Sequence, residues 1–138
     1  MEVRVRAHGH ENVTGRHGST FEITREPEIG PTADCIIGVR ADRACADLPE
    51  GFKRALRSGV RVEVELRLGR LRDRVVGRGD PRLKLSDEVS MVFRRSDYVD
   101  ERTVLVRCDK AARDLDRRLI RRLRDPNAVL EVRLRVLG

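Results

Sequence analysis

Aromatic residues are scarce in this chain, which has three phenylalanines, one tyrosine and no tryptophan among its 138 residues. Modules that bind single-stranded nucleic acid usually stack bases on such rings, so the scarcity argues against a stacking platform. Cysteine occurs three times, at Cys35, Cys45 and Cys108, with neither a CxxC pair nor the spacing of a disulfide framework. This usage fits a reducing compartment and excludes an all-cysteine zinc site.

Long hydrophobic runs are also missing. No segment approaches the roughly 18 apolar residues that a membrane helix needs. The N-terminal stretch "MEVRVRAHGH" has no apolar signal core. We therefore expect a cytoplasmic protein without a membrane partner, and its length predicts a single domain over residues 1–138.

The basic residues are almost all arginines, because only three of the 30 Lys and Arg residues are lysines, and the net charge is +7. Arginine is the preferred phosphate ligand, which favours nucleic acid or another polyanion as a partner. However, the charges alternate in sign, as in "VRVEVELRLGRLRDR". Such mixed surfaces are typical of ion-pair networks in thermophilic proteins, and we favour this second interpretation.

Two segments of the chain are similar to each other. "VRADRACADL" (39–48) and "VRCDKAARDL" (106–115) are identical at six of ten positions. Each is followed by a helical pattern, a breaker and a strand that alternates apolar and charged residues. The pattern predicts an internal duplication with pseudo-repeats 1–69 and 70–138.

The hydrophobic periods predict the elements of each half. Val3 and Val5 alternate with arginines as in a strand, "STFEIT" (19–24) forms a second strand, and "CIIGV" (35–39) a buried third. The fourth strand carries Val60, Val62, Val64 and Leu66 on one face.

A helix is expected before the fourth strand of each half. Asp42 and Asp109 are predicted as the N-caps of the two helices. The first helix then carries Ala44, Leu48, Phe52 and Ala55 at helical spacing, and the second Ala111, Leu115, Leu119 and Arg122. Gly9 and Gly79 are predicted to form matching tight turns.

These elements predict an α+β fold that is mainly β, built from two copies of a strand–strand–strand–helix–strand unit. Neither half has enough apolar surface to form a core alone. We expect a pseudo-twofold arrangement in which eight strands close as a barrel or pack as a sandwich, flanked by two helices.

The duplication separates residues that serve the fold from residues found in one half only. Polar side chains of the first half correspond to unrelated residues of the second: His8 to Arg78, His10 to Asp80, His17 to Asp87, Glu22 to Val92 and Cys35 to Arg102, while Asp34 corresponds to Glu101. We take this asymmetry as the sign of a functional site. The catalytic candidates are His8, His10, His17, Glu22, Asp34 and Cys35.

The three histidines are also metal-ligand candidates. His8 and His10 lie two residues apart and would share one face of a strand, and a hairpin would bring His17 close to them. Such a set suits a divalent metal such as zinc, or a histidine acid–base centre with Glu22. The alternative is that Gly9 bends the strand and that the histidines occupy solvent-facing turns.

The segments "HGHENV", "STFEIT" and "DCIIGVRADRACADL" resemble an archaeal protein family of unknown function, domain of unknown function 371. The resemblance covers nearly the whole chain and implies an archaeal, cytoplasmic, single-domain protein, but no activity. The positions that match the family signature are His8, Gly9, His10, Asn12, His17, Thr20, Glu22, Thr24, Asp34 and Cys35.

Three function classes stay open on these observations. The first is a small-ligand or metal-binding site, enzymatic or not, in the N-terminal half. The second is a nucleic-acid or polyanion-binding module, for which the candidates are Arg117, Arg118, Arg121, Arg122 and Arg124. The third is a component of a protein assembly; the ligand and the oligomeric state are not predicted.

Overall fold

The computed structural model describes all residues from 1 to 138 and contains eight strands and two short α-helices. The first half consists of β1 (Glu2–His8), β2 (Thr20–Thr24), β3 (Ile36–Gly38), the 3₁₀ turn η1 (Cys45–Asp47), α1 (Glu50–Arg57) and β4 (Arg61–Leu68). The second half consists of β5 (Leu71–Arg78), β6 (Ser90–Arg94), β7 (Thr103–Leu105), η2 (Ala112–Asp114), α2 (Arg117–Arg122) and β8 (Val129–Val136). The predicted order of elements is therefore present in both halves, and the mainly-β α+β class is confirmed.

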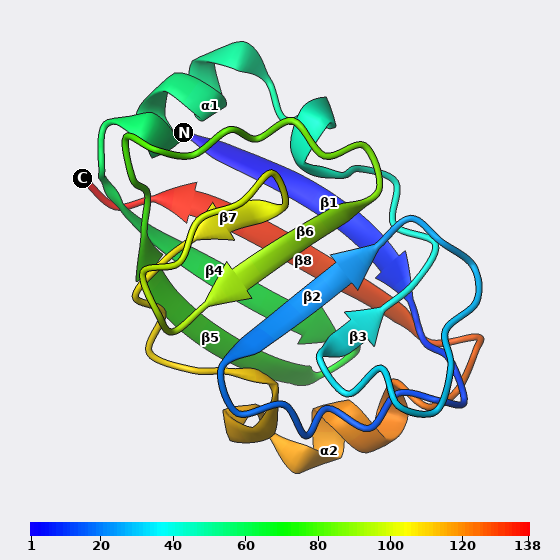
Figure 1. Ribbon diagram of the computed structural model, residues 1–138. Coiled ribbons are helices and arrows are strands. Elements are labelled where there is room, and N and C mark those ends of the chain that lie inside the picture. Colours follow the sequence, from blue (N-terminus) through cyan, green and yellow to red (C-terminus); the bar gives the residue numbers. More distant parts are fainter.

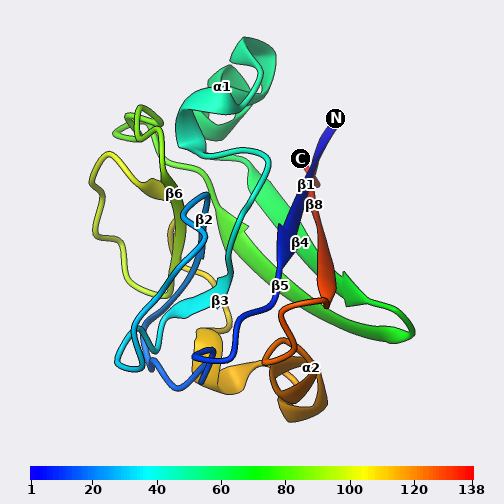
Figure 2. The same ribbon diagram turned by 90° about the vertical axis from the view of Figure 1, so that its right-hand side faces the viewer.

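The strands form two four-stranded sheets that face each other, with α1 and α2 at opposite ends (Figures 1 and 2). The first sheet has the order β1-β8-β4-β5 and is antiparallel throughout. The second has the order β3-β2-β6-β7, in which β2–β6 is antiparallel and the two outer pairs are parallel. Both sheets have a strand of each half at their centre, so neither half completes a sheet alone.

The closed-barrel alternative is wrong. Between the edges of the two sheets the strand pairing is reduced to isolated bridges, between His8 and Val39 and between Arg78 and Val106. Beyond His8 and Arg78 the chain leaves the first sheet for the helix ends, and β3 and β7 are only three residues long. Each ladder therefore stops before a continuous barrel wall can form.

The core lies between the two sheets. Along β1, β4 and β8 every second side chain points into it, and these positions hold valine, leucine or alanine. On the facing sheet, Phe21 of β2 and Phe93 of β6 are direct cross-strand partners with stacked rings 4.6 Å apart. Full burial of each ring contributes on the order of 2–3 kcal/mol, so this pair anchors the junction of the two halves.

Asp42 and Asp109 occupy matching positions, but neither is a helix N-cap. The Asp42 carboxylate accepts a hydrogen bond from the backbone N–H of Arg6 on β1, and that of Asp109 accepts one from Val76 on β5. Each aspartate therefore satisfies a donor on an edge strand of the first sheet. The N-caps of α1 and α2 are Pro49 and Asp116, of which only Asp116 caps with its side chain.

The helices are shorter than the apolar spacing indicates. Ala44, Leu48 and Phe52 are all buried, but η1 contains the first turn and Pro49 separates it from α1. In the second half Leu115 is the C-cap of η2, and α2 begins only at Arg117. A 3₁₀ turn followed by a short helix buries the same face as one helix would, so the apolar spacing alone does not distinguish them.

Gly9 and Gly79 occupy equivalent positions in the two halves, but neither is needed for the predicted tight turn. Neither has a positive φ angle. A Cβ at Gly9 would collide with the backbone carbonyls of Leu123 and Asp125 behind α2, and one at Gly79 with the carbonyl of Leu56 in α1. Each glycine lets one half approach the helix end of the other half.

We predict that Gly9→Ala and Gly79→Ala each lower the free energy of unfolding by about 3 kcal/mol, because the added methyl group meets backbone that cannot move aside. Denaturant unfolding measures the change. Gly30→Ala is the control: nothing lies within 4 Å of its Cβ position, and we expect a change below about 0.5 kcal/mol. Equal effects at Gly9 and Gly30 would contradict the close approach.

Candidate functional site

The three histidines occupy three separate local environments. His8 ends β1, where its backbone bridges to Val39, while His10 and His17 lie in the loop that leads to β2. Partial burial and the nearby Arg40 and Arg6 lower the pKa of His8 below its usual value. No group of three or more His, Cys, Asp or Glu side chains in the structure is arranged to hold a metal ion.

His17 and its counterpart Asp87 make the same hydrogen bonds. Nδ1 of His17 accepts from the backbone N–H groups of Ser19 and Thr20, at 3.2 and 3.1 Å. The Asp87 carboxylate accepts from the N–H groups two and three residues further on, at 3.1 and 2.7 Å. An imidazole nitrogen and a carboxylate oxygen are both acceptors, so the two residue types perform one structural task.

His10 repeats this relation with Asp80. Its Nδ1 accepts from the N–H of Asn12 at 3.0 Å, and the Asp80 carboxylate accepts from the N–H of Arg82 at 2.8 Å. The Nε2 atom of His10 also lies 3.0 Å from a carboxylate oxygen of Glu28. His10 and His17 therefore both accept backbone hydrogen bonds that stabilise the loop. The difference in residue type between the two halves does not indicate this structural role.

A hollow of about 430 Å³ adjoins His10, and Glu28, Arg40 and Pro126 are among the residues that line it. It is the only one of the four hollows of the structure that contains a candidate from the histidine set. His8 and His17 line none of them.

Glu22 and Cys35, two of the six catalytic candidates, lie next to each other. The thiol of Cys35 lies 3.6 Å from a carboxylate oxygen of Glu22, and the guanidinium of Arg102 lies 3.9 Å from the same oxygen. Glu22 belongs to the central strand β2, and the residue is only 7% exposed. Asp34 contributes its backbone carbonyl, which accepts from the N–H groups of Arg16 and His17.

This cluster is poorly suited to nucleophilic chemistry. Burial, followed by the charge of Glu22, raises the pKa of the Cys35 thiol to about 11, so the reactive thiolate is scarce at neutral pH. The other two cysteines are buried, and burial raises the pKa of each to about 12. Neither Glu22 nor Cys35 lines any of the four hollows of the structure.

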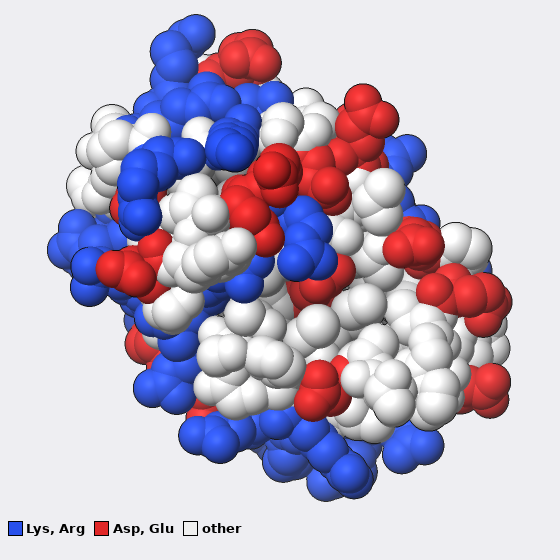
Figure 3. Space-filling view, in the orientation of Figure 1, with Lys and Arg blue, Asp and Glu red and all other residues white.

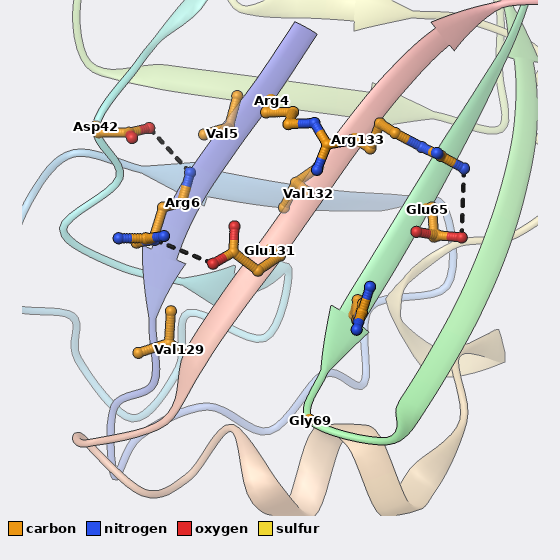
Figure 4. Close-up of a pocket in the computed structure, with 11 residues that line it drawn as sticks. Arg4, Val5, Arg6, Asp42, Glu65, Gly69, Val129, Glu131, Val132 and Arg133 are labelled. Carbon is orange, nitrogen blue, oxygen red and sulfur yellow. Dashed lines mark hydrogen bonds and ion pairs between the residues drawn. The ribbon is translucent and has the colours of Figure 1, made fainter. Parts of the chain in front are cut away.

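The largest hollow lies on the outer face of the β1-β8-β4-β5 sheet and has a volume of about 770 Å³ (Figure 4). Arg6 reaches Glu131 there, at 3.1 Å, and Arg133 reaches Glu65, at 3.4 Å. Arg4 and Arg67 complete the basic lining. In the sequence these residues are the polar side of alternating strands, and no local pattern singles them out. The strand register places arginines from three strands in one groove.

The five arginines proposed for nucleic acid gather at α2, at one end of the molecule, where Figure 3 shows many basic side chains. Arg118 is paired with Asp116 at 2.8 Å. Arg118, Arg121 and Arg122 line one hollow beside Leu71. Arg117, Arg121 and Arg124 line another together with Arg16, a residue of the β1–β2 loop that the sequence analysis missed.

We predict that His17→Asp leaves the free energy of unfolding within about 0.5 kcal/mol of the parent value, because aspartate makes the same bonds at position 87. His17→Ala removes the acceptor from two backbone donors and should cost about 1 kcal/mol. Urea unfolding of both variants distinguishes them. A functional histidine without a structural task would show no stability difference between the two substitutions.

We predict that Cys35 of the folded protein is alkylated by iodoacetamide at pH 8 at least about ten-fold more slowly than in the urea-unfolded chain, because its raised pKa depletes the thiolate. The rate should keep rising above pH 9, and Glu22→Gln should increase it by removing the like charge. Mass spectrometry of each cysteine gives the rates, and the buried Cys45 serves as an internal control. A plateau near pH 9 would contradict the raised pKa.

The comparisons with known proteins identify the family of this chain. The model of the family described as "Domain of unknown function (DUF371)" matches residues 5–137. An uncharacterised protein of Methanocaldococcus jannaschii, MJ0206, is 37% identical over 125 residues, which is 91% of this chain and 93% of that protein. Neither helix of the structure is long and apolar enough to cross a membrane. The chain thus belongs to the family with the domain of unknown function DUF371.

Proposed function

We propose that this protein binds the phosphate backbone of a double-stranded nucleic acid on the outer face of the β1-β8-β4-β5 sheet. One observation carries the proposal: three pairs of arginines lie directly opposite each other on neighbouring strands of this face. They are Arg4 with Arg133, Arg67 with Arg72 and Arg61 with Arg78. Arg4 and Arg133 are each ion-paired to a glutamate, whereas the arginines of the other two pairs form no ion pair. Like charges in directly opposed positions destabilise a sheet, and a polyanion would relieve the repulsion within these two pairs.

The face as a whole has a large basic surplus. Nine arginines project from it against four glutamates, Glu2, Glu63, Glu65 and Glu131. The arginines are Arg4, Arg6, Arg61, Arg67, Arg72, Arg74, Arg78, Arg133 and Arg135. Such a one-sided distribution is the electrostatic footprint expected of a surface that contacts phosphates.

The glutamates of the face hold arginines in place. The Glu63 side chain is 8% exposed, and its carboxylate accepts a hydrogen bond from Arg74 and lies 3.1 Å from Arg135 and 3.7 Å from Arg133. The hydrogen bond from Arg74 is the main cause of its lowered pKa. Arg67 and Arg72 form no ion pair and stay available for a ligand.

Duplex rather than single-stranded nucleic acid is proposed because no aromatic ring lies on this face. Single strands are bound largely by stacking of bases, whereas contacts to a duplex backbone need only cationic donors. This site differs from the α2 arginines that the sequence analysis selected for nucleic acid.

The small-ligand or metal-dependent function, enzymatic or not, stays a prediction. What supports it now is the hollow beside His10, where an imidazole and a carboxylate meet. The proposed role of the protein in an assembly also stays a prediction.

We also infer that the two halves are an internal duplication related by a pseudo-twofold axis. The matching aspartate bonds to β1 and β5 support this inference. So do the positive φ angles of Arg40 and Arg107, which are 50° and 52° and follow the two sheet-joining bridges. The reciprocal contacts of Gly9 and Gly79 with the helix ends are further support.

We predict that Arg67→Ala/Arg72→Ala weakens binding to a 20-base-pair duplex by at least about ten-fold at low salt and reduces the slope of log K against log[salt] by about two, since two phosphate contacts are lost. Fluorescence anisotropy over a salt series, with DNA and RNA duplexes, measures both quantities. The control Arg54→Ala/Arg95→Ala removes the same charge from other surfaces. Equal weakening by both double variants, or no binding of the parent protein at 50 mM salt, would contradict the proposal.

A further inference from the structure

A second basic site lies apart from the sheet face, between the β1–β2 loop and α2. It is a hollow of about 230 Å³, and its apolar lining residues are Val13 and Ile120. Four arginines surround it, Arg16 from the loop and Arg117, Arg121 and Arg124 from the α2 region. No carboxylate lines it, in contrast to the groove on the sheet, where three acidic residues accompany the arginines.

The positive charges of this hollow are not neutralised within the protein. The side chains of Arg16, Arg121 and Arg124 form neither an ion pair nor a hydrogen bond, and all three residues are exposed. Bringing four guanidinium groups to one small volume costs electrostatic free energy. A bound anion is the simplest way to offset that cost.

Arg117 is already held in position for a ligand. Its guanidinium donates to the backbone carbonyls of Leu115, Gly15 and Ala112, at 3.1, 3.0 and 2.6 Å. Carbonyl oxygens fix the side chain without removing its charge. An anion therefore meets an ordered donor, which lowers the entropy cost of binding.

Thr14 is a further polar residue at the same hollow. It lines the hollow, and its hydroxyl oxygen is buried without a hydrogen-bond partner in the protein. Buried hydroxyls are normally paired, so an unpaired one beside four arginines is a second indication of a ligand.

Gly15 brings the loop close enough to α2 to form the hollow. Its φ angle is +57°, and a Cβ there would lie 2.8 Å from the Ile120 side chain. Glycine meets both demands, because it adopts positive φ readily and occupies no space at that point.

The corresponding place at α1 has no such site. α1 begins with Glu50 where α2 begins with Arg117, and Lys53 stands where α2 has Ile120. Lys53 donates to the carbonyl of Ala46 at 3.0 Å and lies 3.6 Å from Glu50. The acid-free arginine cluster is therefore specific to α2, although both halves share the surrounding elements.

We propose that this hollow binds a phosphate group, presented by inorganic phosphate or by a phosphomonoester. Arginine forks match the oxygens of a tetrahedral phosphate and donate paired hydrogen bonds to it. The volume suits one such group with a small attached body, not a polymer lying lengthwise. The site is independent of the sheet face, because the two share no residue.

Thermal unfolding and calorimetric titration with inorganic phosphate, against chloride at matched ionic strength, test the proposal. We expect phosphate to raise the melting temperature, and Arg121→Ala/Arg124→Ala to weaken phosphate binding at least ten-fold. The control is Arg118→Ala/Arg122→Ala, which removes the same charge from α2 outside this hollow and should change the affinity less than three-fold. No stabilisation beyond chloride, or equal losses in the two double variants, would overturn the proposal.

The variant Thr14→Val distinguishes a contact of Thr14 with the ligand from a contribution of Thr14 to stability. The parent hydroxyl is buried and unpaired, so its removal should leave the free protein as stable as before or more stable, while phosphate affinity falls several-fold. Unchanged phosphate affinity together with unchanged stability would remove Thr14 from the site.

Two further titrations identify the source of the phosphate. A nucleoside 5′-monophosphate is compared with the nucleoside, and a 5′-phosphorylated oligonucleotide with its unphosphorylated form. A gain in affinity that depends on the phosphate and is lost in Arg121→Ala/Arg124→Ala supports the site. The size of this gain identifies the preferred source. Failure here would not affect the duplex proposal, whose test uses Arg67 and Arg72.

Discussion

The antiparallel pairing of β4 with β8 is the interaction on which the rest of the structure depends. β4 ends the first half and β8 ends the second, and together they form the centre of the first sheet. Their inward side chains, such as Val64 opposite Leu134 and Leu66 opposite Val132, form the middle of the core. Because β1 pairs with β8 and β5 with β4, the halves alternate across this sheet, and the core closes only when both are present.

The same pairing determines the charge pattern on the outer face. Once Val64 faces Leu134, the outward neighbours must align in fixed rows, which place Glu63 opposite Arg135 and Glu65 opposite Arg133. These rows stabilise the sheet. On the adjoining strand Arg67 faces Arg72, and neither of them forms an ion pair, although Glu131 stands opposite Arg67 on β8. A face that served stability alone would alternate signs throughout, and this one does not.

Equivalent positions of the two halves that carry different residues do not all have different roles, as the histidines and the α2 arginines show. His17 and Asp87 differ in type, yet both accept hydrogen bonds from the following turn, so a difference in chemistry concealed an identity of structural role. Arg117 and Glu50 also differ, but their surroundings differ too: Arg117 joins an acid-free cluster, whereas Glu50 neutralises Lys53. A residue difference indicates function only when the hydrogen bonds and charges around it differ as well.

The sequence by itself determined the order of the elements and which side of each strand is buried. Alternation in β1 and β4 and the repeated "VRxD" segments are local patterns, and local patterns depend on period and propensity alone. Tertiary structure decided that the sheets stay separate, that Asp42 bonds to β1 rather than to a helix, and that Gly9 makes room for the end of α2. It also decided which arginines meet without a counter-charge. These outcomes depend on partners more than 30 residues away along the chain, as between Asp42 and Arg6 or Gly9 and Leu123, and no local period records which distant backbone a side chain will reach.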